Sequence, residues 1–321
     1  MTWIWFTASL LAFAAGFALH RGGICAVAAV REAIEEKKWA RFFSFLECAA
    51  WALIVLLIAD AAGAMAIGAW PSRMSIPAAM AGGALFGAGA LINGACAFGS
   101  ASRLAAGETS FLVLVLGFVL GAILALQMGL GADIALRQAT AAPQWTLAAI
   151  ALGLAAFAVW RIWTAFRAAP TPAKVAERIA SPHWPPALAM AVIGLANVGL
   201  LLMVLNWPYT SLLVDVSIGR GMAYAARAGL VVAFLGGAMA GAVSAGRFKL
   251  RGPRGVDIAQ RLGGGVLMGF GGVMIPGGND GLVLVGLPLL QPTAAAAYTA
   301  MILVIAAGFY VRLLARRRSA A

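Results

Sequence analysis

The sequence predicts an all-α integral membrane protein with about nine transmembrane helices in two inverted repeats. Hydrophobic residues make up 63% of the 321 residues and charged residues only 11%, which is too apolar for a water-soluble fold. Apolar stretches near the length of about 20 residues that a helix needs to cross a bilayer recur along the whole chain. A glycine-rich pattern also occurs twice, at an offset of 182 residues.

Nine apolar stretches are separated by short polar or Gly/Pro-marked breaks. The first stretch has no basic segment before it and no small-x-small cleavage site after it, so we expect it to remain as a span and not to be removed as a signal peptide. The expected spans are residues 3–19, 46–69, 78–98, 111–130, 145–166, 187–205, 228–246, 262–281 and 292–314.

The basic residues predict the orientation of these spans. With the N-terminus in the periplasm and nine crossings, most Lys and Arg residues fall on the cytoplasmic side, as the positive-inside rule requires. Only Arg73, Arg137, Arg220 and Arg227 fall on the opposite side, and Arg21 lies at the edge of the first span. The net charge of +12 is therefore interpreted as membrane topology, and no nucleic-acid partner is expected.

The repeat is clearest between residues 85–99 and 267–281. Four residues of the first stretch, Leu85, Gly87, Gly89 and Gly99, recur at the offset of 182. Five crossings separate corresponding spans, and because this number is odd, the second half is expected to be inverted relative to the first. We predict a first repeat at 1–140, a connecting span with a cytoplasmic loop at 141–180, and a second repeat at 181–321.

Four segments are expected to be broken or re-entrant helices. Residues 20–36 and 207–227 contain too many glycines and polar groups to face lipid and too many apolar residues for an ordinary loop. Non-helical backbone at membrane depth occurs only where it is buried in protein or lines a cavity, so both are predicted to be short re-entrant helices. Glycine-rich breaks around Cys96 and Gly278 should interrupt spans three and eight, and all four elements should converge at the centre.

The three cysteines match neither a disulfide framework nor a zinc site, so we expect free thiols, no metal and no cofactor. Cys25 and Cys96 each follow a glycine break, where a helix N-terminus supplies free N–H donors and partial positive charge. Buried cysteine also often serves only to fill space, and for these two residues both interpretations stay open. Cys48 begins an ordinary span and is interpreted as filler.

Several polar residues beside the breaks are candidates for the pathway. Arg21 and Arg220 could attract an anion at the two mouths, or could instead reach lipid phosphate. Asp280 is a candidate for a proton or cation relay if it is buried, although it could equally reach solvent. Asn93 and Asn279 add neutral hydrogen-bonding groups at the two glycine breaks.

Three motifs resemble the YeeE/YedE family of bacterial inner-membrane proteins associated with the uptake of thiosulfate and other sulfur compounds. They are Arg-Gly-x-x-Cys after the first span, Gly-Ala-Cys-x-x-Gly in the third, and the glycine-rich run that begins at Arg261. The resemblance implies that thiosulfate or a related small sulfur-containing anion passes thiols at the waist of an hourglass-like pathway, here Cys25 and Cys96. Where thiosulfate-carrying members have Gly-Cys-Asn in the second half, this chain has Gly277-Gly278-Asn279.

Two other classes of function are weighed against transport. In the first, a membrane-embedded sulfur relay, a cysteine persulfide would pass sulfur to a cytoplasmic acceptor. No recognisable general base accompanies either cysteine, whereas inverted repeats are the usual basis of passage from both sides. In the second, a purely structural subunit, the repeated glycine breaks would be unexplained. We therefore expect a transporter and not an enzyme, with the lipid bilayer and a cytoplasmic sulfur-carrier protein as candidate partners.

Overall fold

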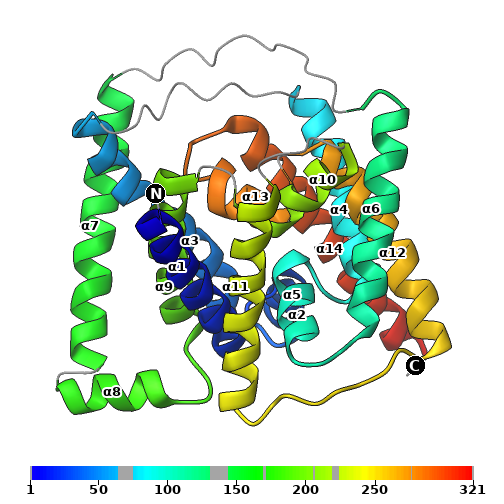
Figure 1. Cartoon of the computed structure of the whole chain (residues 1–321), viewed down its shortest axis with the longest axis horizontal. Coiled ribbons are helices and arrows are strands. Elements are labelled where there is room, and N and C mark those ends of the chain that lie inside the picture. The colour runs from blue at the N-terminus through cyan, green and yellow to red at the C-terminus, as the bar shows by residue number, and fades with distance from the viewer. Residues whose placement is uncertain are drawn as a thin grey trace.

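The computed structural model describes residues 2–63, 75–130, 144–168, 171–204, 207–218, 224–275 and 277–319, and most of them are helical (Figure 1). The first half of the chain contains α1 (Thr2–Gly22), α2 (Ala26–Glu35), α3 (Ala40–Ala61), α4 (Ile76–Asn93), α5 (Ala97–Ala105) and α6 (Ser110–Gln127). The connecting region contains α7 (Gln144–Ala168) and α8 (Pro172–Ala180). The second half contains α9 (Pro186–Val204), α10 (Tyr209–Ile218), α11 (Tyr224–Ser244), α12 (Gly255–Val273), α13 (Asn279–Gly281), the π-helix η2 (Leu282–Gly286) and α14 (Pro292–Ser319).

The protein is an all-α, multi-pass membrane protein. Within the described residues, eight helical segments are long and apolar enough to cross a membrane. The expected span at 262–281 falls mainly on α12, which is not among the eight. Its first two turns carry Asp257 and Arg261, and the rest is rich in glycine, both of which lower its hydropathy. The total of nine spans therefore stays a prediction.

The helices of the two halves begin at corresponding positions. Shifting the starts of α1 to α6 by 182 residues reproduces the starts of α9 to α14 within three residues, once η2 is joined to α13. The shift is 182 for α5 onto α13 and for α6 onto α14. The domain boundaries at 140 and 180 and the inversion of the second half stay predictions.

Packing between the long helices follows the same correspondence. Helix α1 packs against α11, and its counterpart α9 packs against α3; helix α12 packs against α6, and its counterpart α4 packs against α14. The equivalent pairs α1 with α9 and α4 with α12 are also in contact. A two-fold axis between the halves would produce this pattern, and it yields two groups of four long helices. The short helices α2, α5, α10 and α13 lie between the groups (Figure 1).

Glycines let the long helices approach closely. A Cβ atom at Gly117 of α6 would lie 2.5 Å from the Leu262 carbonyl oxygen of α12, and one at Gly265 of α12 would lie 2.5 Å from the Leu114 carbonyl oxygen of α6. No ordinary side chain fits at such distances. Small residues allow this kind of backbone contact between membrane helices. Glycine at these two positions therefore lets the backbones of α6 and α12 touch.

Both predicted breaks in the long spans are present. Helix α4 ends at Asn93, followed by Gly94 in the left-handed conformation at φ 63°, and α5 begins three residues later. Helix α12 ends at Val273, and Gly277 has φ 80° just before α13. Left-handed backbone favours glycine, which explains why glycine stands at these turns. Each break places the start of a new helix inside the protein.

Candidate functional site

The candidate site is the place where the starts of α2, α5 and α13 meet. Cys25 and Cys96 are the N-cap residues of α2 and α5, and their backbones are extended. The Cys96 Sγ–H donates to Cys25 Sγ across 3.8 Å. Cys96 Sγ in turn accepts the N–H of Ala26, the first residue of α2, at 3.1 Å. The structure thus brings together the two thiols that the sequence singled out, as a pair of free thiols.

The second half of the chain reaches this pair through Asn279. Its Oδ1 accepts the N–H of Ala97, the first residue of α5, at 2.9 Å. The Nδ2 atom of Asn279 is buried and has no hydrogen-bond partner. Tyr209 at the start of α10 donates its hydroxyl to the Ala97 carbonyl at 2.8 Å. An unpaired buried amide donor costs about 1–3 kcal/mol, so this N–H group is available to a ligand that arrives at the thiols.

Asp280 and Thr210 form a separate buried group next to Asn279. The Thr210 hydroxyl donates to Asp280 Oδ1, and the Thr210 N–H donates to Oδ2 at 3.3 Å. The same hydroxyl oxygen accepts the Gly278 N–H at 2.7 Å. The sequence left open whether Asp280 is buried or reaches solvent. Its side chain is buried, with 2% of its surface exposed. This group ties the starts of α10 and α13 together.

The site is closed to solvent from both sides. The exposed fraction is 8% for Cys25 and 0% for both Cys96 and Asn279. The first N–H groups of α2 and α5 already bond to protein side chains. These donors are therefore occupied in this structure.

A family model described as sulphur transport matches residues 21–307. The chain belongs to the sulphur-transport family. This is the YeeE/YedE family that the motifs resemble. No curated protein was found to match the chain. The family and the membrane helices together support a role in sulfur transport, and the matched region contains the whole site described above.

Gly278 stands at the position where the resemblance described above implies a third cysteine. It is the N-cap of α13, with φ −95° and ψ −162°, close to the φ −84° and ψ −175° of Cys96. Any residue can adopt this backbone. Space is the obstacle, because a Cβ atom there would lie 2.9 Å from the Phe86 ring and 2.9 Å from Asp280 Oδ1. Phe86 and Asp280 therefore fill the position of the third thiol.

Arg21 holds the connecting region to the first helix. Its guanidinium donates to the carbonyl oxygens of Ala180, the last residue of α8, and of Ser181, and to Ser244 Oγ of α11 at 2.9 Å. The Trp184 N–H donates to the Arg21 carbonyl at 3.0 Å. The side chain is buried between the end of α8 and α11. Its predicted counterpart, Arg220, lies outside the described residues.

Asn93 lies at the end of α4, where it belongs to the packing of the helix break. Its carbonyl oxygen accepts from the Arg261 guanidinium, which also lies 4.2 Å from the centre of the Phe111 ring. The Asn93 Nδ2 donates to Met268 Sδ at 3.4 Å, and its Oδ1 is buried without a partner. Among the bonds of the described residues, none joins Asn93 to either thiol. Arg261 was missed as a structural residue because the sequence shows only its charge.

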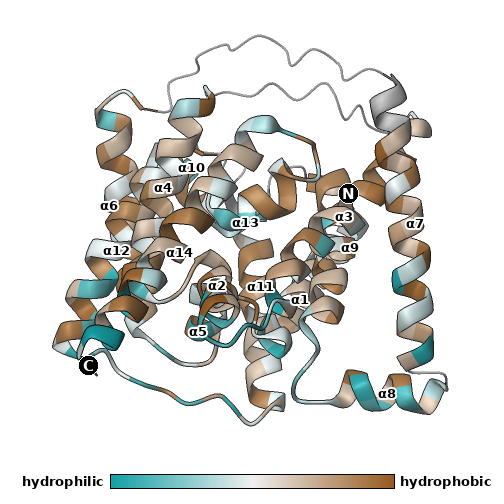
Figure 2. Ribbon diagram, turned by 180° about the vertical axis from the view of Figure 1, so that it is seen from behind, coloured by the Kyte–Doolittle hydropathy of each residue, from teal (hydrophilic) through white to brown (hydrophobic). Residues whose placement is uncertain are grey.

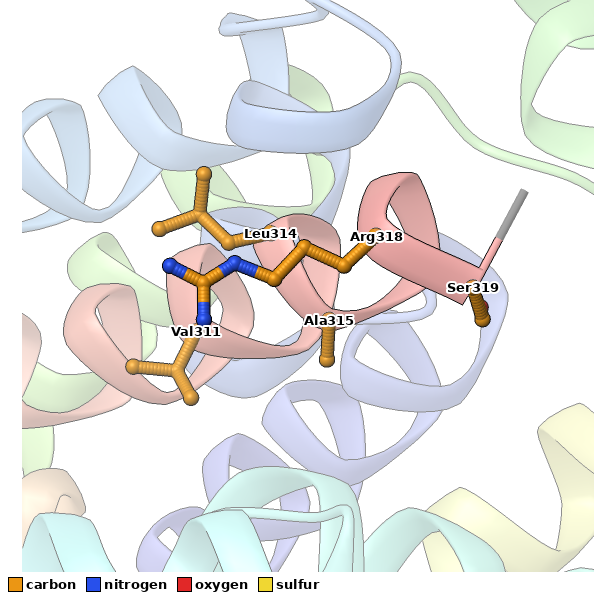
Figure 3. Close-up of a pocket in the computed structure, with 5 residues that line it drawn as sticks. All are labelled: Val311, Leu314, Ala315, Arg318 and Ser319. Carbon is orange, nitrogen blue, oxygen red and sulfur yellow. The ribbon is translucent and has the colours of Figure 1, made fainter. Parts of the chain in front are cut away.

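Cys48 is separate from the site. It is fully buried in α3, and its carbonyl oxygen lies 2.7 Å from where a Cβ of Gly194 in α9 would be. This tight contact between α3 and α9 explains why residue 194 is glycine, and the role of Cys48 as filler stays a prediction. The pocket in Figure 3 is also separate, because Val311, Leu314, Ala315, Arg318 and Ser319 all belong to the last turns of α14.

Tyr209 and Thr210 were not singled out from the sequence. They lie within the predicted segment 207–227, yet each hydroxyl bonds to the first half-turn of another short helix. The run Tyr209-Thr210-Ser211, three consecutive hydroxyl residues at the start of a helix, was the available signal. A polar cluster at membrane depth is unusual unless it has buried partners.

Proposed function

We propose that this protein carries thiosulfate, or a related small sulfur-containing anion, across the bacterial inner membrane past the Cys25 and Cys96 thiols. The observation that carries the proposal is the thiol pair at 3.8 Å beside the unpartnered Asn279 amide. Thiols and amides are donors without negative charge, so they can accept an anion at this depth. The terminal sulfur of thiosulfate suits weak S–H contacts, whereas the oxygens of sulfate favour stronger donors.

The starts of α2 and α5 add electrostatic support. Both helices are at least nine residues long, and each directs its N-terminal N–H groups toward the thiol pair. The positive end of a helix dipole stabilises an anion. In transporters with inverted repeats, broken helices commonly meet an anionic substrate in this way at the membrane midplane. Rotation of Cys96 and Asn279 would free the Ala26 and Ala97 N–H groups for the substrate.

The basic residues support the orientation. Helix α8 and the C-terminal end of α14 lie at the lower edge of Figure 2, and these segments carry the basic residues Lys174, Arg178 and Arg316. The positive-inside rule places this edge in the cytoplasm. The N-terminus would then face the periplasm if the total number of crossings is odd. We retain this orientation as part of the proposal.

A sulfur relay is the second candidate function. The adjacent thiols favour it, since one could hold a persulfide within reach of the other. Against it, no acidic or basic side chain among the described residues hydrogen-bonds to either thiol, and the Asp280 carboxyl is bonded to Thr210. Carriage of the intact anion needs no such base. A cytoplasmic sulfur-carrier protein is a candidate partner in either case.

The two functions differ in which sulfur atom enters the cell. Thiosulfate labelled in the outer sulfur and thiosulfate labelled in the inner sulfur are supplied separately to bacterial cells that lack other uptake routes and express this protein. Intact transport predicts equal initial entry of both labels, with sulfate competing poorly. Entry of the outer label alone would replace the transport proposal with the relay. Failure of both labels to enter, with entry of another sulfur anion, would change the substrate.

A further inference from the structure

Asp280 is a buried carboxyl group that has no role in the anion transport proposed above. It accepts hydrogen bonds from the hydroxyl and the N–H of Thr210 and from the backbone N–H groups of Asp280 and Gly281, and no Lys, Arg or His of the described residues pairs with it. Ionisable residues at membrane depth are costly unless they are paired or take part in function. Its position directly after Asn279 places it beside the proposed anion pathway, so the inference rests on the proposed function.

The hydrogen bonds around Asp280 suit both of its protonation states. The Thr210 hydroxyl oxygen accepts the Gly278 N–H, which leaves one hydrogen to donate and one lone pair to accept with. When Asp280 is ionised, that hydrogen is donated to Oδ1, as the structure shows. When Asp280 is protonated, the carboxyl can donate to the remaining lone pair of the same hydroxyl. The carboxyl therefore keeps Thr210 as a hydrogen-bond partner in both states, while the Thr210 hydroxyl hydrogen turns away from Oδ1 in the protonated state.

The charge of Asp280 conflicts with an anion at Asn279. Two like charges separated by one residue repel strongly in a medium of low dielectric constant. Anion binding at the thiols should therefore favour the neutral carboxyl, and by reciprocity a proton on Asp280 should favour anion binding. Binding of the two is coupled without direct contact between them.

Other titratable groups near Asp280 do not supply this coupling as readily. Helix α13 packs against α10, α5 and η2. On α10, Tyr209 already donates its hydroxyl to the Ala97 carbonyl, and Asp215 is paired with Arg227. At the start of α5, Cys96 is engaged with Cys25, and Arg103 lies at the far end of that helix near the Phe111 ring. Residues 282–286 of η2 are apolar.

We propose that Asp280 binds a proton together with the anion and releases it on the cytoplasmic side, so that the protein is a proton–anion cotransporter. Thr210 acts as the positioning residue that serves both states of the carboxyl. The transported species is then the anion together with a proton, and the proton gradient across the membrane is the driving force.

The test uses the full chain in liposomes that contain a pH-sensitive dye, with the voltage clamped at zero by potassium and an ionophore. Thiosulfate is the probe, and both its labelled uptake and the internal pH are followed. We expect the wild-type protein to move about one proton with each thiosulfate, as linkage to a single carboxyl requires. Asp280→Asn should abolish the proton movement and the response of uptake to an imposed pH gradient. The control Asp215→Asn should keep both.

A second pair of variants covers the case in which Asp280→Asn does not fold. Thr210→Val removes the donor to the carboxylate, so the proton binds more tightly and the pH dependence of uptake should shift to higher pH. Thr210→Ser keeps the hydroxyl and should keep the wild-type profile. Thiosulfate uptake without internal acidification, or identical profiles for the two Thr210 variants, would overturn the inference and leave the proposed function intact. Lack of thiosulfate uptake by the wild-type protein would overturn both.

Discussion

The N–H of Ala97 donates to Oδ1 of Asn279 at 2.9 Å, and these two residues occupy equivalent positions in the two halves of the chain. They are separated by 182 residues, the offset of the repeat, and each is the first residue of its short helix. The two broken spans therefore meet at their breaks. One residue of the pair caps the helix of the other, which makes Asn279 both a structural cap and a candidate ligand.

Replacing Asn279 by alanine should lower thiosulfate uptake per folded molecule at least tenfold. The change removes both the cap of Ala97 and the unpartnered amide donor, and loss of a cap alone costs about 1 kcal/mol of stability. Asn197→Ala is the matched control, because Asn197 is also buried and bonds to the Leu284 carbonyl at 2.5 Å, on α9 and η2. Melting temperatures and initial uptake rates are measured for both. Equal uptake per folded molecule in the two variants would remove Asn279 from the pathway.

Gly278→Cys should reduce the amount of folded protein even though the backbone permits it. The new Cβ would lie 2.9 Å from the Phe86 ring, so the ring must move. Overpacking of this kind typically costs about 1–3 kcal/mol. Combining Gly278→Cys with Phe86→Leu should recover folded protein and thiosulfate uptake, because it restores three thiols and gives them space. The double variant is compared with Phe86→Leu alone by thermal unfolding and uptake, and no recovery would show that the crowding argument is wrong.

Arg21→Gln should act mainly on stability. The guanidinium holds the carbonyl oxygens of Ala180 and Ser181, and the shorter amide reaches neither with the same geometry. Loss of buried, charge-assisted hydrogen bonds costs about 1.5–3 kcal/mol, so the melting temperature should fall by several degrees. The KM for thiosulfate is measured at low and high salt. Suppose that the KM of the variant is much higher than that of the wild-type protein at low salt, and that the difference disappears at high salt. This result would support anion attraction by Arg21 at the mouth.

Reporter fusions test the orientation. We expect a reporter at the N-terminus to be active in the periplasm and one at the C-terminus to be active in the cytoplasm, because the basic clusters favour the inside. A further reporter in the loop after α8 should be cytoplasmic. Both ends on one side of the membrane would contradict nine crossings and would fit the eight apolar helical segments of the described residues instead.

The parts of the fold that depend on local sequence could be predicted. Long apolar stretches define spans, and glycine-marked turns define breaks, so Gly94 and Cys96 were placed correctly at the interruption of the third span. The predicted ends of the spans were less accurate where a helix continues into charged residues. Helix α12 begins at Gly255, before the predicted residue 262, because its charged first turns are helical although they are not apolar.

The contacts within the site could not be predicted in the same way. The pairing of Asn279 with Ala97, of Thr210 with Asp280, and of Arg21 with Ser181 each joins residues far apart in sequence. Hydropathy and motif spacing carry no information on which side chain meets which backbone group across the repeat. Arg21 is an example: the sequence left anion attraction and contact with lipid phosphate as its two possible roles, and it gave no sign of the bonds to Ser181 and Ser244 that the structure shows.

The central claim is that the Cys25 and Cys96 thiols line the pathway. Its most direct test is the initial rate of labelled thiosulfate uptake by Cys25→Ala, Cys96→Ala and Cys48→Ala at matched membrane abundance. Removing one buried sulfur atom should cost roughly 1 kcal/mol of stability, so all three variants should fold and insert. We predict that Cys25→Ala and Cys96→Ala lose uptake and that Cys48→Ala keeps it. Full uptake by both Cys25→Ala and Cys96→Ala would contradict the account and show that the thiols only fill space.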